Sequence, residues 1–341
     1  MLDGACRACR RHRSTLTLTA SLAGTLVLAV LLIGRWDELE TGVTGAPLAI
    51  IAATVSLQLV ALLARTEAWH ACVGACGGEV SRRVLYRASS MGFVGGLVHT
   101  QLGTAARIAA LRRSAPEASP RVPALIGAEL PILIVEGGLA ALTSFTLVGP
   151  LGLPWWTPVV CLLAVGGVSA MLRGVAAAGV RWLRSGLAVL RTLDGSGRVA
   201  GLVLVAVFAQ IARNWLLLRA VGVDASLFDA IAVLIAVVTL GQLPFGLSVG
   251  AAASVLILGP QGVAAAAAAG VLLTATGTVG GLCFAAWGAL DIALSTPRSR
   301  AVATRAGSLL SAFPGFAISG HLLATPMLAV ASGAWLQPRR V

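Results

Sequence analysis

Apolar runs long enough to cross a lipid bilayer recur along the whole chain, and they restrict the possible folds more than any other feature. A spanning helix needs about 20 mostly apolar residues, and several separate stretches reach that length. Hydrophobic residues make up 57% of the sequence and charged residues 11%, unlike soluble globular domains. We therefore expect an all-α, polytopic integral membrane protein. No polar stretch is long enough for a soluble domain, so function is expected within the membrane or at its surface.

The positive charge comes entirely from arginine, because the sequence has no lysine, and the net charge is +12. The arginines flank apolar runs, which fits the positive-inside rule and anionic headgroups at the cytoplasmic face better than nucleic-acid binding. Residues 1–13 are accordingly expected to form a basic cytoplasmic tail, and residues 14–341 a single transmembrane domain. The first apolar run is long and lacks an evident cleavage site, which indicates a retained helix. Abundant alanine, glycine and valine, together with the lack of lysine, indicate a GC-rich genome. We therefore expect a bacterial protein of the inner membrane.

Following the arginines from side to side predicts about seven spanning helices and two re-entrant hairpins. The hairpins are expected at Ser89–Leu111, which is basic on both flanks, and at Leu227–Leu258, which is interrupted by Gly241–Gly250. Residues 173–198 carry arginines and leucines at helical spacing, which predicts an amphipathic helix on the cytoplasmic surface. The expected spans are Ser14–Gly34, Thr44–Ala64, Val122–Leu147, Thr157–Leu172, Val199–Leu218, Gly262–Leu290 and Gly307–Leu336.

The two interrupted segments resemble each other. Gly103–Leu111 aligns with Gly250–Leu258 at an offset of 147, and Arg65–Trp69 aligns with Arg213–Trp215 at nearly the same offset. Halves 14–149 and 155–293 would each hold three spans and a hairpin, so they would run in opposite directions. Glycine-broken segments at matching places in inverted halves point to a transport site near the midplane. The alternative is that alanine- and glycine-rich helices look alike through composition alone.

The third expected span carries Glu129, Pro131 and Glu136. A carboxylate at bilayer depth is costly, so such residues usually line a polar path or pair with another helix. The two glutamates are seven residues apart, which places them on one side of the helix. Pro131 removes one backbone hydrogen bond and frees a carbonyl near Gly127. This helix is therefore expected to face a polar interior.

Arg107 is the main candidate for contact with a phosphate. It follows Gly103, which is expected to begin a short helix whose free N–H groups suit an anion. The alternatives are a cytoplasmic topology arginine, structural pairing of the glutamates with Arg107 or Arg213, and polar residues that hold helices together. Trp69 and Trp215 are expected to be interfacial anchors. The predicted substrate-binding residues are Gln101, Gly103, Arg107, Glu129, Glu136, Gln210, Arg213, Asn214, Ser248 and Gly250.

No catalytic motif, cofactor or metal site is expected. Nucleophile-elbow, phosphate-loop and zinc-protease patterns are absent from the sequence, as is an aspartate-rich diphosphate motif. Cys6, Cys9 and His12 have metal-like spacing but offer only three ligands within the basic tail, so a solvated tail is expected. Cys72 and Cys76 share a helical face and are expected to pack.

The order of these motifs resembles the transmembrane domain of lysylphosphatidylglycerol synthases, a flippase-like family that also includes stand-alone membrane proteins. The resemblance covers residues 47–293. It rests on Arg65-x-x-x-Trp69, Gly103-x-x-x-Arg107-x-x-x-Leu111, the Glu129 helix, and Leu243–Gly250 followed by Gly262-Val263. It implies movement of a lipid between leaflets, in the synthases an aminoacylated phosphatidylglycerol made by a separate soluble domain.

The chain departs from the family pattern where charge matters. It has no soluble aminoacyl-transferase domain, so lipid aminoacylation is not expected. Thr104 stands where the family has an acidic residue, His99 where it has a proline, and Ala253 where it has a glutamate. These departures leave the family's substrate open.

Taken together, the sequence favours a translocator of a phospholipid or polyprenyl-linked lipid, with membrane lipids as partners. One alternative is a non-transporting scaffold or regulator that binds envelope-biosynthesis enzymes. The other is a membrane-embedded lipid or glycosyl transferase, whose outer acidic candidates are Asp37, Glu38, Glu40, Asp224 and Asp229.

Overall fold

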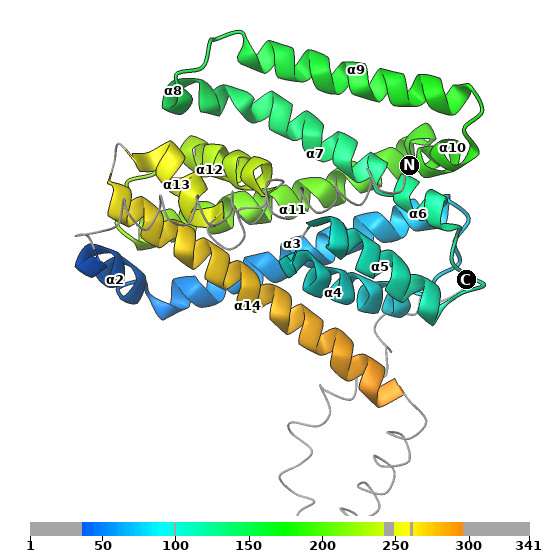
Figure 1. Ribbon diagram of the computed structural model, residues 1–341, viewed down its shortest axis with the longest axis horizontal. Coiled ribbons are helices and arrows are strands. Elements are labelled where there is room, and N and C mark those ends of the chain that lie inside the picture. Colours follow the sequence, from blue (N-terminus) through cyan, green and yellow to red (C-terminus); the bar gives the residue numbers. More distant parts are fainter. Residues whose placement is uncertain (1–35, 99, 242–248, 260–261, 296–341) are drawn as a thin grey trace, which may run out of the picture. The chain divides into compact units, whose positions relative to one another are not determined.

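The computed structural model describes residues 36–98, 100–241, 249–259 and 262–295 (Figure 1). Within these ranges the regular structure is entirely helical. Five described segments are long and apolar enough to cross a membrane: Leu48–Ala75, Val122–Leu151, Thr157–Ala177, Asp194–Ala220 and Val263–Ser295. The expectation of a helical protein with several segments long and apolar enough to cross a membrane is thus confirmed. The first and last predicted spans, Ser14–Gly34 and Gly307–Leu336, lie outside the described residues.

The chain divides into two compact units at Ala285, within the last long helix. Every contact discussed below belongs to the first unit. Its helices follow one another along the chain in Figure 1 as α2 (Trp36–Thr44), α3 (Leu48–Ala75), α4 (Arg82–Val98), α5 (Thr100–Ser114), α6 (Val122–Gly127), α7 (Leu130–Thr143), the 3-10 helix η1 (Ser144–Leu147), α8 (Val148–Leu151), α9 (Thr157–Ala177), α10 (Arg181–Gly186), the 3-10 helix η2 (Ala188–Arg191), α11 (Leu193–Ala220), α12 (Leu227–Leu240), α13 (Val249–Leu258) and α14 (Val263–Ser295).

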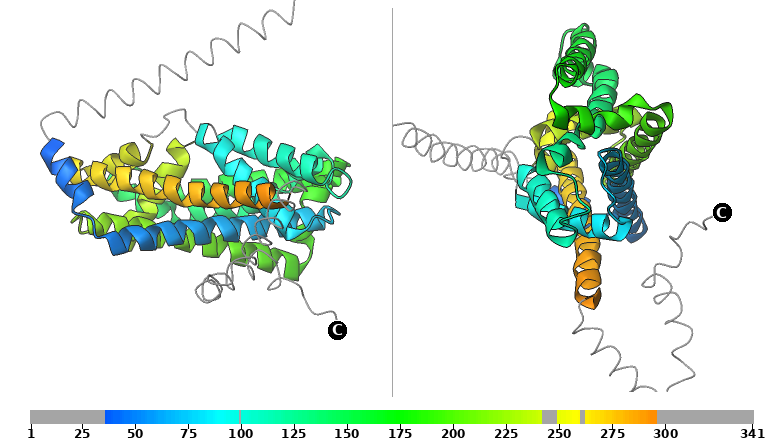
Figure 2. Two further views of the ribbon diagram at one scale, coloured as in Figure 1. Left: turned by 90° about the horizontal axis from the view of Figure 1, so that it is seen from below. Right: turned by 90° about the vertical axis from the view of Figure 1, so that its right-hand side faces the viewer.

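Helices α3 and α11 pack along each other in opposite directions (Figures 1 and 2). Each is 28 residues long. Alanines form a buried cluster where the two helices meet, and Gln58 of α3 reaches Gln210 of α11. Small side chains let two helix backbones approach closely, which is how membrane helices gain packing energy. The alanines of this cluster are Ala61, Ala64, Ala206 and Ala209.

Two helix pairs, α4–α5 and α12–α13, start from opposite ends of the α3–α11 pair (Figure 1). Helix α4 follows the C-terminus of α3 and α12 follows the C-terminus of α11, and the antiparallel packing separates these two ends. Glycines bring α5 close to α4, because a Cβ at Gly103 would lie 2.8 Å from the Gly92 carbonyl oxygen. Gly103 does not begin its helix, contrary to expectation, because α5 already starts at Thr100. Its role is close packing.

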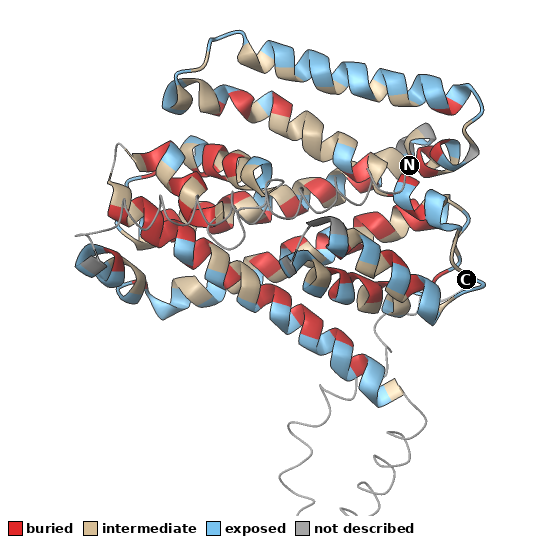
Figure 3. Ribbon diagram, viewed as in Figure 1, coloured by how far each residue is buried: buried red, intermediate tan, exposed pale blue. Residues whose placement is uncertain are grey.

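Helix α9 exposes most of its surface (Figure 3). Leu163 and Met171 are 70% and 62% exposed. Trp155 and Trp156 lie exposed just before this helix, and Trp182 lies exposed just after it. Tryptophans at both ends of an apolar helix match the aromatic belts of membrane proteins. Surface of this kind suits acyl chains and not water.

Residues 173–198 do not form the amphipathic helix that we expected. Arg173 belongs to α9, and Gly179 ends that region at φ +104°, a backbone conformation that L side chains rarely adopt. Leu183 and Leu187 then pack into a buried cluster with Ala176. Because these leucines find partners within the protein, the segment folds as α10 and η2, and α11 already begins at Leu193.

The second span also differs from its prediction, because α3 continues to Ala75 and not to Ala64. Charged residues within this extension are neutralised inside the protein. Glu67 accepts a hydrogen bond from the Tyr86 hydroxyl at 2.9 Å, and it lies 3.6 Å from the Arg82 guanidinium and 3.8 Å from that of Arg198. A helix can keep charged residues when neighbouring helices pair them.

Cys76 caps α3 and ties it to two other helices. Its thiol donates to the Ser185 carbonyl at 3.3 Å and lies 3.7 Å from the Ala124 carbonyl. Burial raises the pKa of the Cys76 thiol to about 11.

This pKa gives a pH-dependent reactivity, because only the thiolate is alkylated. In a variant that keeps Cys76 alone, the maleimide reaction rate should rise about tenfold per pH unit and continue to rise beyond pH 9. The same variant unfolded in detergent should level off near pH 9. Equal profiles in the two states would contradict the buried placement of this thiol.

Candidate functional site

Arg107 lies inside the packed helices. Its guanidinium stands 4.1 Å from the centre of the Trp69 ring and forms an ion pair with Glu129. The two charged side chains are only 13% and 12% exposed. A guanidinium over an indole face gains a cation–π attraction, and this strengthens where water is excluded. The pairing of Arg107 with Glu129 was one of the alternatives that the sequence left open.

Glu129 owes its position to a break in the third long apolar segment. Helix α6 ends at Gly127 and α7 begins at Leu130, with Pro131 in the first turn. At the break, the Glu129 amide donates to the Ile126 carbonyl at 3.2 Å, as in a tighter helix. Proline cannot donate a backbone hydrogen bond and disfavours a continuous helix before it. The break therefore places a carboxylate where α5 can reach it.

Glu136 pairs with Arg65 of α3 at 2.8 Å. This contact was not expected, because the predicted span Thr44–Ala64 ends just before Arg65. Arg65 and Trp69 are one helical turn apart, so both ion pairs lie along one side of α3. We call Arg65, Trp69, Arg107, Glu129 and Glu136 the arginine–glutamate cluster.

Trp69 is fully buried, so it is not the interfacial anchor that the sequence suggested. The reason is that α3 continues past Arg65, which carries Trp69 into the core beside Arg107. The cluster holds two arginines and two glutamates and is neutral overall. Glu136 stands midway along the apolar segment Val122–Leu151, and Glu129 lies two helical turns from the start of that segment.

A second polar group surrounds Arg213 of α11. The guanidinium donates to the side-chain oxygen of Gln58, to that of Gln210 at 2.9 Å, and to the Leu273 carbonyl at 2.7 Å. Arg213 is 6% exposed. We call Gln58, Gln210 and Arg213 the Arg213 site. Gln58 was not among the residues predicted from the sequence, although a lone glutamine within an apolar run is a signal that could have identified it.

The predicted binding residues thus divide into two groups. Arg107, Glu129 and Glu136 come together in one cluster, and Gln210 and Arg213 in the other. Gln58 and Arg65 are seven residues apart on α3, so the groups lie about 10 Å apart along its axis.

The remaining predicted residues join neither group through any contact described for them. Gly103 packs on α4, and Gly250 packs against Gly270 of α14. Gln101 lies in the first turn of α5, and Ser248 lies outside the described residues. Asn214 is 1% exposed, and its amide has no hydrogen-bond partner within the described part of the chain.

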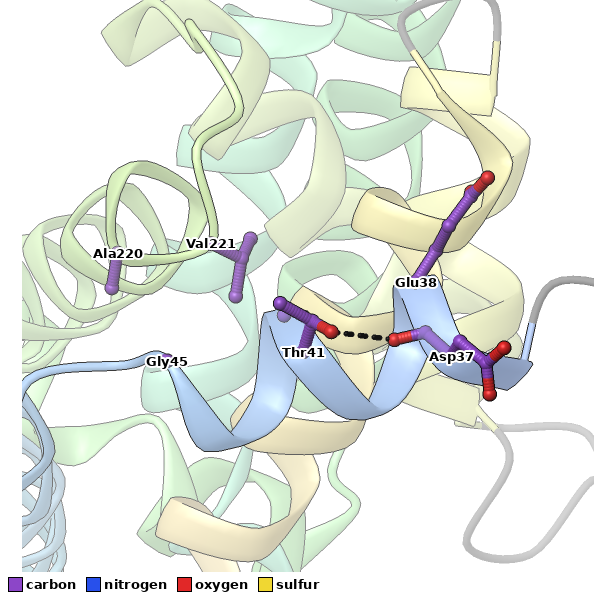
Figure 4. A pocket seen from close by; sticks show the side chains of 7 residues that line it. Asp37, Glu38, Thr41, Gly45, Ala220 and Val221 are labelled. Atoms are coloured by element: carbon purple, nitrogen blue, oxygen red, sulfur yellow. Dashed lines mark hydrogen bonds between the residues drawn. The ribbon is translucent and has the colours of Figure 1, made fainter.

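An open pocket of about 510 Å³ lies elsewhere, between α2 and the end of α11. Figure 4 shows Asp37 and Glu38 on α2, with their carboxylates pointing in different directions, and Ala220 and Val221 across from them. None of the predicted binding residues lines it. We therefore place the candidate site at the two polar groups and not at this pocket.

The acidic residues near α12 have local roles. The Asp229 carboxylate accepts from the Ser226 amide at 2.9 Å and from its hydroxyl at 2.8 Å, which is a capping box at the start of α12. Asp224 lies 3.8 Å from Arg219 on the surface. These contacts account for two of the acidic residues that a transferase would have used.

No family model, curated protein or solved structure matches this chain. Function is therefore inferred from the two polar groups and from their place in the helices.

Proposed function

We propose that this protein moves a lipid with a phosphate-containing headgroup between the leaflets of a bacterial inner membrane. The observation that carries the proposal is the Arg107–Glu129 pair, which is largely buried between apolar helices. Ionisable residues in such a place are costly to keep and usually mark a substrate path. Arginine also binds phosphate in a bidentate manner.

The helix pairs support this proposal if they are re-entrant hairpins. The C-terminal part of α4 and the first turn of α5 expose apolar side chains, with Val94, Leu97 and Leu102 each more than 40% exposed. The other ends of both helices carry arginines, among them Arg82 and Arg113. An apolar tip and a basic base suit a hairpin that enters the membrane from the cytoplasmic side and returns to it.

The arrangement of the two halves supports an inverted repeat. In each half a 28-residue helix is followed by a helix pair and then by a long apolar segment: α3, α4–α5 and α6–α8, then α11, α12–α13 and α14. The helix pairs start at opposite ends, as inverted halves require. The Arg213 site would then lie where the two halves meet, because Gln58 belongs to the first half and Gln210 and Arg213 to the second, and the arginine–glutamate cluster would lie within the first half.

In the proposed mechanism the headgroup exchanges with the internal ion pairs. A lipid phosphate takes the place of the Glu129 carboxylate on Arg107, and Glu129 and Glu136 balance the charge or contact an amine of the headgroup. Because the cluster itself is neutral, the exchange brings only the charge of the headgroup into the apolar region.

A scaffold function has one observation in its favour. Both ion pairs of the cluster join residues of the protein itself, as in a purely structural network. A scaffold would tolerate the loss of both charges of a pair, provided that the fold survives.

Leaflet exchange of fluorescent phospholipids in proteoliposomes tests the proposal. The double variant Arg107→Gln/Glu129→Gln removes both charges together and keeps polar side chains, so neither partner is left as an unpaired buried charge. We expect exchange to fall by about tenfold or more, the value of a charge-assisted hydrogen bond. Arg219→Gln, at a half-exposed arginine, is the matched control and should leave the rate unchanged. A double variant that folds and exchanges lipid at the wild-type rate would overturn the proposal.

A further inference from the structure

The two halves differ in charge at corresponding positions. The long segment of the first half begins at Val122 and that of the second half at Val263. Counting 14 residues from each start leads from 122 to Glu136 and from 263 to Gly277. Counting 7 leads to Glu129 and to Gly270. Counted from these helix starts, an offset of 141 and not the 147 that aligns Gly103 with Gly250, the second half has glycine at both places where the first half has glutamate.

The contacts of the two halves lead to the same correspondence without any counting. Arg65 of α3 meets the Glu136 carboxylate at 2.8 Å. Its counterpart Arg213 of α11 meets α14 at the Leu273 carbonyl and lies beside Gly277, where a Cβ would stand 3.1 Å from the guanidinium. Where Arg65 has a carboxylate beside it, Arg213 has a glycine without a side chain.

Arg213 consequently lacks a counter-charge within the described part of the chain. Its acceptors there are two amide oxygens and one carbonyl oxygen, all neutral, and its Nε has no partner among those residues. The sequence contains no aspartate or glutamate between Asp229 and Asp291. Arginine stays protonated in proteins, so the positive charge cannot be relieved by loss of the proton.

An uncompensated cation that is 94% buried is unfavourable, and neutral acceptors offset only part of this cost. An oxyanion that replaces one neutral acceptor adds the missing charge and can use the fork of the guanidinium. At this depth in a membrane protein, the oxyanions with easiest access carry acyl chains. A phosphate ester that joins a headgroup to such chains fits these conditions.

We infer that the Arg213 site binds the phosphate of an anionic phospholipid. Glycine at position 277 leaves Arg213 without an internal carboxylate that would compete with the phosphate. This inference rests on the proposed function and names its substrate class. Gln58 and Gln210 hold the guanidinium in place from α3 and α11. The arginine–glutamate cluster, which already has its own counter-charges, would not select for an anionic lipid in this way.

Binding of short-chain lipids to the purified full-length chain in detergent tests the inference. The probes are dihexanoyl phosphatidylglycerol, the zwitterionic dihexanoyl phosphatidylcholine, dihexanoylglycerol without phosphate, and inorganic phosphate at matched ionic strength. We expect phosphatidylglycerol to bind about tenfold or more tightly than dihexanoylglycerol, because a charge-assisted contact is gained. Inorganic phosphate that binds as well as phosphatidylglycerol would overturn the assignment to a lipid.

Gly277→Glu supplies the carboxylate that the first half has, and it should reduce phosphatidylglycerol binding about tenfold or more. Gly277→Gln places the same Cβ against the Arg213 guanidinium without the charge, so it should bind phosphatidylglycerol about tenfold more tightly than Gly277→Glu. Equal binding by these two variants would overturn the inference. If either variant fails to fold, Arg213→Gln compared with Arg219→Gln replaces the pair, and only the first should lose binding.

Binding and leaflet exchange fail separately. A protein that binds phosphatidylglycerol through Arg213 but exchanges no lipid would contradict the proposed function and leave the site intact. A protein that exchanges lipid and shows no dependence on Arg213 would contradict the site alone.

Discussion

Arg107→Ala is expected to lower the free energy of unfolding by about 3–5 kcal/mol, because it leaves Glu129 as an unpaired charge in a buried place. The Glu129 side chain is 12% exposed, so water can compensate little of the lost charge pairing. The contact between Arg107 and the buried Trp69 ring is lost as well. Unfolding of the purified protein in mixed micelles, followed by tryptophan fluorescence, measures the change.

The double variant Arg107→Ala/Glu129→Gln is the control for this prediction. It removes the stranded charge and should recover more than half of the lost stability. Arg65→Ala should cost less than Arg107→Ala, because the Arg65 side chain is 45% exposed and water can take over part of its role at Glu136. Equal losses for the two single variants would contradict the difference in burial.

Gly270→Val is expected to destabilise the protein by about 3 kcal/mol through overpacking. Gly270 of α14 rests against the backbone of Gly250 and Ala251 of α13, and a Cβ at position 270 would overlap these backbone atoms. No flexible side chain is there to give way, so α13 must move off α14. Thermal unfolding, scored by the fraction of protein that remains monodisperse in detergent, measures this loss.

Gly138→Val is the matched control, since nothing lies within 4 Å of a Cβ at this glycine of α7. Both substitutions place the same side chain in a helix, so the difference between them isolates the helix contact. A melting temperature for Gly270→Val equal to that for Gly138→Val would show that α13 and α14 do not meet as described.

The long helices could be predicted from the sequence, because a segment that crosses a bilayer needs about 20 apolar residues with every backbone group bonded internally. The end of α3 could not be predicted, because Arg65 and Glu67 look like a membrane boundary until their partners on other helices are known. The same holds for the segment after α9, where buried leucines and not the membrane surface decide the fold.

The candidate residues show the same division. The sequence singled out Glu129 because a carboxylate in an apolar run is costly, and Arg107 because it follows Gly103, where a helix start was expected. It could not pair Glu136 with Arg65, since these residues lie on separate helices and only packing brings them together. The sequence also predicted that Trp69 lies at the membrane–water interface, although the continuation of α3 buries this ring beneath the Arg107 guanidinium.

By itself, then, the sequence determined the helical class, the segments apolar enough to span a membrane and the few costly side chains within them, because these follow from the energy of moving residues out of water. Only the tertiary structure decided that Arg65 and Arg107 have internal carboxylates and that Arg213 has glycine in the corresponding place. Charge compensation depends on distances of a few ångströms between helices, and those distances are set by packing that no linear pattern records.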